Sequence, residues 1–138
     1  MERSMIEMKG LLLKLALILL IASPCHAFDN WNTEEKIAQG AAIGLTIIDW
    51  GQTLYISDHS EYYEKWNFLL SEHPSRSSVN LYFGLSIIGK TALVHILPRD
   101  YNLFGFNIKP RRIVQSTYIG ISGYNVFNNA RIGIKISF

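Results

Sequence analysis

Two long apolar stretches, residues 38–56 and 79–97, most constrain how this chain can fold. The only charged residue of the first stretch is Asp49, and the second stretch carries Lys90 and His95. A membrane-spanning helix needs roughly 20 apolar residues, so each stretch is close to that length. We expect each stretch to form one long helix, and the two helices to pack as an antiparallel hairpin.

Start and stop signals delimit these two helices. Residues 32–35 (Asn-Thr-Glu-Glu) offer a capping oxygen followed by acidic side chains, which favour the positive end of a helix dipole. The first helix is therefore predicted over about 34–57. Residues 73–75 (His-Pro-Ser) open the second helix, because the proline bars helix before it and the serine can cap the helix after it. Pro98 ends it.

The last third of the chain mixes helix and strand signals. Pro110 starts a third, weaker helical segment that is predicted over 111–128. Strict alternation of apolar and polar residues over 131–138 is typical of a strand, and alternation over 104–109 predicts a short strand that could pair with it. The expected fold class is mainly α, with about three helices, two of them in an antiparallel hairpin, plus a short C-terminal β-strand.

The N-terminal segment, 1–27, has the pattern of a secretory signal peptide. Scattered charge is followed by an apolar run over 15–22 and then by small residues. Cleavage after Ala27 fits the small side chains of Ala27 and Cys25 at positions −1 and −3. One alternative is an uncleaved anchor, although the apolar run is short for a span. The other is lipid attachment at Cys25, which the preceding Pro24 disfavours.

Cleavage would leave a single small domain, residues 28–138, with ten basic and nine acidic side chains and no cysteine. This balance offers no basic face for phosphates, so nucleic acid is not an expected partner. Seven Tyr, seven Phe and three Trp, together with few charges, favour a lipid bilayer or an envelope protein as the partner. We expect an exported protein of the cell envelope, in a membrane or at its periplasmic face.

A small outer-membrane β-barrel is the structural alternative. Residues 79–88 alternate much as a barrel strand does, and the terminal Phe138 is typical of a closing barrel strand. The predicted mature length is short for eight strands of roughly ten residues. The barrel would nevertheless avoid a conflict. If the helix pair followed a signal sequence into an inner membrane, the basic connector 98–112 would lie outside, against the positive-inside preference.

Two motifs carry a resemblance to other proteins. Residues 49–53 (D-W-G-Q-T) and residues 73–83 (H-P-S-x-x-x-V-N-x-Y-F) resemble a group of small exported or membrane-associated helical proteins of bacteria and their phages. The resemblance extends from Trp31 to Phe138. In that group an Asn-Pro pair tends to precede His-Pro-Ser, whereas here Asn67 is followed by a phenylalanine. The resemblance implies a helical build and placement in the envelope, and no known activity.

A polar cluster is expected within the apolar stretches. Its predicted members are Asp49, Gln52, Thr53, Lys90 and His95. An acid inside an apolar stretch is costly unless it is paired or hydrogen-bonded. In a hairpin with ends near residues 57 and 77, Asp49 and Lys90 are offset by five residues, about 7.5 Å, which a lysine stem nearly covers. We expect either a structural ion pair or a proton- or ligand-linked pair.

A loop motif between the two helices completes the candidate residues: Asn67, His73, Pro74 and Ser75. The spacing of the histidines is not that of a metal site, and neither a nucleophile elbow nor a glycine-rich phosphate loop occurs. We therefore expect no metal and no cofactor. The expected function is that of a non-enzymatic envelope component that acts through membrane or protein contact. An enzyme using Asp49 and a histidine is the alternative.

Overall fold

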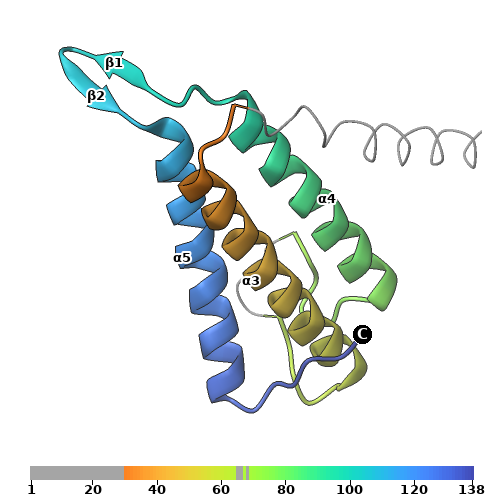
Figure 1. Ribbon diagram of the computed structural model, residues 1–138. Coiled ribbons are helices and arrows are strands. Elements are labelled where there is room, and N and C mark those ends of the chain that lie inside the picture. The colour runs from red at the N-terminus through yellow and green to blue at the C-terminus, as the bar shows by residue number, and fades with distance from the viewer. Residues whose placement is uncertain (1–29, 65–66, 68) are drawn as a thin grey trace, which may run out of the picture. The chain divides into compact units, whose positions relative to one another are not determined.

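The computed structural model describes residues 30–64, 67 and 69–138, of which 33–138 form one compact unit. The elements, in chain order, are α3 (Thr33–Asp58), α4 (Arg76–Ile96), β1 (Tyr101–Leu103), β2 (Phe106–Ile108) and α5 (Pro110–Arg131) (Figure 1). The expected mainly α class with three helices is confirmed, and the described residues form no barrel. The predicted signal peptide lies outside the described residues.

The helices begin and end where their local chemistry allows. Glu34 and Glu35 occupy the first turn of α3. The hydroxyl of Ser75 caps α4 by accepting a hydrogen bond of 3.2 Å from the Ser78 backbone N–H, as predicted. Pro110 stands in the first turn of α5, where its missing N–H costs no helical hydrogen bond. This third helix continues to Arg131, three residues beyond its predicted end.

Helix α3 lies against both other helices, which make few contacts with each other. It packs antiparallel to α4, as expected of a hairpin, and two hydrogen bonds define their register. Gln39 pairs with Thr91 at 3.1 Å, and Trp50 pairs with Asn80 at 2.9 Å. Both pairs have residue numbers that add up to 130, so α4 starts level with residue 54 of α3.

Helices α3 and α5 are parallel. Thr46 lies beside Ser122 and Asp49 beside Asn125, and in both pairs the residue numbers differ by 76. One end of the bundle thus holds the starts of α3 and α5, the end of α4 and the β-hairpin, and we call it the hairpin end. The other end, which we call the loop end, holds the 59–75 loop and the C-terminal tail (Figure 1).

The apolar core is small and lies at the loop end. It consists of Leu54, Leu70, Val79 and Phe83, with Trp50 and Tyr82 packed against it. The Trp50 ring stacks on Phe83, with 6.2 Å between the ring centroids. The core thus joins α3 to the start of α4. Other contacts hold the rest of the bundle together.

The predicted pairing of the C-terminal strand is wrong. β2 pairs with β1 across a two-residue turn, and residues 132–138 form no strand. Closing a hairpin over two residues costs much less chain entropy than joining segments more than twenty residues apart. The tail instead runs along α3, where the Ser137 N–H donates to the Gly51 carbonyl at 3.0 Å.

Candidate functional site

The candidate site is a polar pocket of about 170 Å³ towards the loop end, lined by all three helices and the 59–75 loop. It contains carboxylates from α3 and the loop, an ammonium from α4 and carboxamides from α5 and the loop. The polar residues that contribute these groups are Asp49, Glu64, Asn67, Lys90, Asn125, Asn128 and Asn129. The pocket therefore offers both charges and many hydrogen-bonding groups to a small polar molecule.

Asp49, a member of the predicted polar cluster, lines this pocket, but its hydrogen-bond partner is one that sequence reasoning missed. Asn125 of α5 donates from Nδ2 to Asp49 Oδ2 at 3.5 Å. The Thr53 hydroxyl, predicted to accompany the carboxylate, donates to the Asp49 backbone carbonyl at 2.9 Å instead. The sequence does contain a signal for this partner. The polar residues 115, 122, 125 and 129 are spaced so that they lie on one face of α5.

Lys90 lines the same pocket without forming an ion pair with Asp49 in the described structure. The hairpin register places Lys90 level with residue 40, nine residues or about 13.5 Å from Asp49 along the helix axis. The predicted offset of five residues is wrong because α4 starts level with residue 54, not at the end of α3. The lysine Nζ lies 5.3 Å from the centroid of the Tyr118 ring, within cation–π range.

The other two predicted cluster members lie elsewhere. Gln52 is buried on the face of α3 towards α5, and its Nε2 donates to the Val126 carbonyl at 3.3 Å. His95 is exposed in the last turn of α4 and does not line the pocket. Asp49, Thr53 and Lys90 thus line one pocket, whereas Gln52 and His95 lie outside it.

The loop motif divides in the same way. Asn67 lines the pocket, and its Oδ1 accepts a hydrogen bond from the Leu69 N–H at 3.2 Å. Ser75 caps α4, Pro74 before it is buried, and His73 is exposed. Only Asn67 of the four motif residues contributes to the candidate site.

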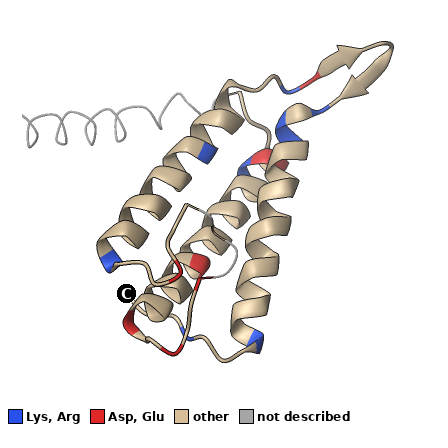
Figure 2. Ribbon diagram, turned by 180° about the vertical axis from the view of Figure 1, so that it is seen from behind, with Lys and Arg blue, Asp and Glu red and all other residues tan. Residues whose placement is uncertain are grey.

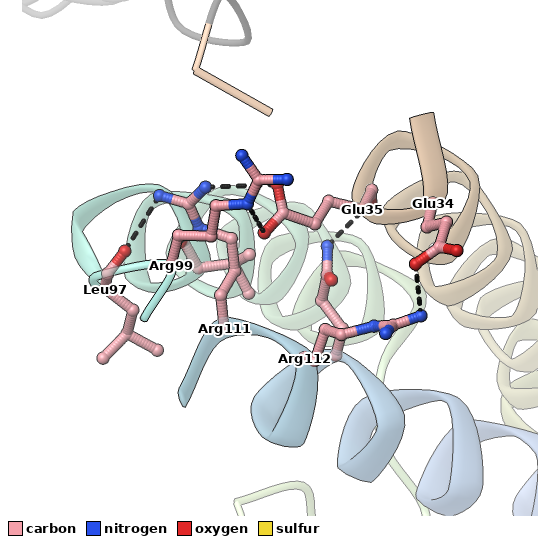
Figure 3. A network of polar contacts seen from close by, with 8 residues as sticks. Glu34, Glu35, Leu97, Arg99, Arg111 and Arg112 are labelled. Atoms are coloured by element: carbon pink, nitrogen blue, oxygen red, sulfur yellow. Dashed lines mark hydrogen bonds and ion pairs between the residues drawn. The ribbon is translucent and has the colours of Figure 1, made fainter. Parts of the chain in front are cut away.

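A second polar cluster, at the hairpin end, was not predicted (Figure 3). Arg111 of α5 donates to Glu35 of α3 at 3.4 Å, and their side chains are 7% and 2% exposed. The same guanidinium donates to the carbonyls of Val94 at 3.2 Å and Leu97 at 2.9 Å, at the end of α4. One buried arginine thus satisfies a carboxylate and two carbonyls, and it ties the three helices together.

Amides extend this cluster across the bundle. Gln115 is fully buried and donates from Nε2 to the Glu35 carbonyl at 2.9 Å and to Gln39 Oε1 at 3.3 Å. Gln39 in turn donates to the Thr91 hydroxyl of α4 at 3.1 Å. These bonds connect the buried ion pair to all three helices, which indicates a structural role for the cluster.

Among the described residues, no group of three or more His, Cys, Asp or Glu side chains has an arrangement that could hold a metal ion. A scan against protein-family models, a search of curated proteins and a search of solved structures each found no match. The function of the bundle and its pocket must therefore be inferred from their geometry.

Proposed function

We propose that this chain is an exported, non-enzymatic envelope protein whose three helices lie in a membrane and act by contact with lipid or with another envelope protein. A reversal of polarity carries the proposal. Many large apolar side chains face outwards from the bundle, while polar side chains supply a large share of the buried contacts between its helices, above all between α3 and α5. Soluble domains show the opposite arrangement, because burial of apolar surface drives their folding.

The outward face of α4 supports the proposal most directly. This helix is long and apolar enough to cross a bilayer, yet only 17% of its most apolar window is buried. Leu85 is 60% exposed and Ile96 is 75% exposed. A core helix of similar composition in a soluble protein would be mostly covered. Lipid chains are the natural cover for such a face.

The interior supplies the second half of the argument. The buried polar or charged residues of the helices are Glu35, Gln39, Thr46, Gln52, Thr53, Arg111, Gln115 and Ser122. In lipid, helices associate through packing and interhelical hydrogen bonds, since apolar burial provides no driving force there. The bonds that join α3 to α5 are of this kind. A polar residue on the outer side of α5 fits as well, because the Thr117 hydroxyl donates to the Ile113 carbonyl of its own helix.

Most charges lie near the two ends of the bundle, with Asp49 of α3 and Lys90 of α4 as charges within the helices (Figure 2). Between Lys36 and Asp58, α3 contains only Asp49 as a charged residue, and α5 contains none between Arg112 and Arg131. At 1.5 Å per residue the three helices are about 32 to 39 Å long, enough for a hydrocarbon layer of roughly 30 Å, and among the described helices α4 alone is also apolar enough to cross it. The resemblance of residues 49–53 and 73–83 to small membrane-associated helical proteins agrees with this placement.

Cysteine accessibility in intact membranes tests the proposal. In a Cys25→Ser background, Leu85→Cys probes the outer face of α4 and Ser71→Cys probes the exposed loop. We expect a water-soluble maleimide to label Ser71→Cys when it reaches that side of the membrane. Leu85→Cys should stay unlabelled because lipid covers it, and the protein should resist extraction by alkaline carbonate.

A buried control separates lipid cover from protein cover. Val79→Cys lies in the protein core, so it should stay unreactive after detergent solubilisation and react only on unfolding. Leu85→Cys should become reactive as soon as a small detergent replaces the lipid. Rapid labelling of Leu85→Cys in sealed and permeabilised membranes alike would place α4 in water and refute the proposal. The side on which Ser71→Cys reacts also gives the orientation.

A further inference from the structure

The β-hairpin projects from the end of the bundle (Figure 1), and the described residues leave it largely uncovered. Its register aligns Tyr101 with Ile108 and Leu103 with Phe106. Because side chains alternate along a strand, these four apolar residues share one face of the hairpin. The opposite face carries the aligned pair of asparagines, 102 and 107. The hairpin is thus amphipathic, and its apolar face is without a partner in the described structure.

The turn places a strained aromatic at the tip of the hairpin. Phe104 has a φ of 51° and Gly105 a φ of 86°, the positive values that a type I′ turn needs at both central positions. Asparagine or aspartate is the usual residue at the first of these positions. Here a phenylalanine adopts the left-handed conformation with its side chain 90% exposed. Strain at such a site persists where it serves a contact, so the aromatic tip itself indicates a binding role.

Basic side chains surround the base of the hairpin. Arg99 precedes β1, Lys109 follows β2, and Arg112 stands in the first turn of α5, all of them exposed. Arg99 also lies 4.0 Å from Glu35, and Arg112 pairs with Glu34 at 2.6 Å. Asp100 is the only acidic residue of the 98–112 segment. An apolar tip with cations at its base matches the layered chemistry of an anionic lipid surface, where acyl chains lie below phosphates.

We propose that this hairpin docks into the headgroup layer of an anionic phospholipid bilayer. Phe104 and the apolar face enter the acyl boundary, and Lys109 and Arg99 lie among the phosphates. This inference rests on the proposed function, which places α4 in the same bilayer. The exposed apolar side of α4 ends at Ile96, shortly before the hairpin begins. Both surfaces then contact one bilayer, and the docked hairpin fixes how deep the bundle sits.

Site-specific fluorescence in proteoliposomes tests this docking. A Cys25→Ser protein carries one environment-sensitive nitrobenzoxadiazole label, at Phe106→Cys on the apolar face or at Asn107→Cys on the opposite face. In vesicles that contain phosphatidylglycerol, lipids with a shallow nitroxide should quench the label at 106 at least about two-fold more than the label at 107. A third label at Leu85→Cys reports separately on whether α4 lies in lipid.

Two substitutions in the labelled Phe106→Cys protein sharpen the test. Lys109→Gln should lower the ratio of docked to undocked hairpin roughly five-fold, since each basic residue near an anionic surface contributes about 1 kcal/mol. Phe104→Asn suits the left-handed turn better than phenylalanine does, so the hairpin keeps its fold while docking weakens. Replacing all phosphatidylglycerol by phosphatidylcholine should also weaken docking, because the basic residues then meet no anionic lipid.

The outcomes distinguish this inference from the proposed function. Quenching at 85 with equal, weak quenching at 106 and 107 refutes the docking and leaves the membrane-embedded bundle standing. Quenching at 106 without quenching at 85 supports the docking and refutes the embedded bundle. A label at 106 that is shielded but not quenched, with dimers on cross-linking, shows that a second copy covers the hairpin and overturns the inference.

Discussion

The hydroxyl groups of Thr46 on α3 and Ser122 on α5 lie 3.4 Å apart in the buried centre of the bundle. These two residues are 76 positions apart in the sequence. The same separation holds for Glu35 and Arg111 near one end of the bundle and for Asp49 and Asn125 towards the other. Polar pairs at three levels therefore share one register. Sliding α5 along α3 by a single turn would break all three contacts at once, so these pairs specify both the direction and the level of packing.

The buried pair of Glu35 and Arg111 should dominate stability at the hairpin end. Arg111→Met removes the buried cation beside Glu35, leaving the half-exposed Arg99 at 4.0 Å, and takes the donor from two carbonyls at the end of α4; it should destabilise the protein by about 3 kcal/mol. The neighbouring pair of Glu34 and Arg112 is shorter, at 2.6 Å, but its side chains are 66% and 48% exposed. Arg112→Met should therefore cost less than about 1 kcal/mol. Thermal unfolding in detergent compares the two variants.

A double variant separates the ion pair from the carbonyl contacts. With Glu35→Gln already present, Arg111→Met should still cost about 1–2 kcal/mol, because the carbonyls of Val94 and Leu97 remain without a donor. If the double variant is as stable as Glu35→Gln alone, the arginine does not hold the end of α4. Equal losses for Arg111→Met and Arg112→Met would contradict the importance of burial.

The sequence predicted single elements well and their mutual placement poorly. The predicted helix 34–57 and the predicted helix between the Ser75 cap and Pro98 match α3 and α4 to within one residue, because caps, proline and apolar length act locally. The level of α4 on α3 was wrong, since nothing local determines how the 59–75 loop uses its length. A pattern within one helix also cannot reveal a parallel partner that lies far away along the chain.

The same distinction applies to the candidate site. Asp49 was identified from a local signal, an acid within an apolar stretch, and it does line the pocket. Its partner Asn125 was missed because an asparagine in a weakly apolar helix gives no comparable signal. Gln52 is on the same helix as Asp49, but its side chain points towards Val126. Spacing along a helix predicts which residues share a face, but it does not predict which of two neighbouring helices that face contacts.

Asp49 should couple differently to its two polar neighbours. A double-mutant cycle of Asp49→Asn with Lys90→Met should give a coupling below about 1 kcal/mol that falls with added salt, because the two charges do not touch and salt screens separated charges. A cycle of Asp49→Asn with Asn125→Ala should give a coupling of about 0.5–1 kcal/mol that salt does not change. Unfolding at two salt concentrations checks both cycles. A large, salt-insensitive coupling to Lys90 would mean that the two side chains do meet.

Export should remove the N-terminal segment 1–27. The predicted cleavage after Ala27 places Phe28 at the amino terminus of the exported protein, and intact-mass spectrometry of the membrane fraction measures this directly. Ala27→Arg should slow processing, because a bulky charged side chain does not fit position −1. Recovery of an intact Met1 terminus from the wild-type chain would show that the segment is retained as an anchor.

The C-terminal tail should depend on one glycine of α3. A Cβ at Gly51 would lie 2.5 Å from Ile136 Cγ2 and 2.9 Å from Phe138 Cζ, while a Cβ at Gly44 would meet nothing within 4 Å. Both substitutions gain helix propensity, up to about 1 kcal/mol, so Gly44→Ala should raise the unfolding temperature. In Gly51→Ala the tail has to move, because Ile136 Cγ2 is bonded directly to its Cβ and is not the far end of a flexible side chain. The hydrogen bond from the Ser137 N–H is lost with it.

Limited trypsin digestion separates these two effects. The freed tail should be cut after Lys135 several-fold faster in Gly51→Ala than in the wild type or in Gly44→Ala, with loss of residues 136–138 seen by mass. The order of sensitivity matters more than the absolute rate, because detergent slows the protease for all three proteins. Equal cleavage of the three would mean that the tail does not pack on α3 in solution. The close approach of Ile136 and Phe138 would then have no part in holding the end of the chain.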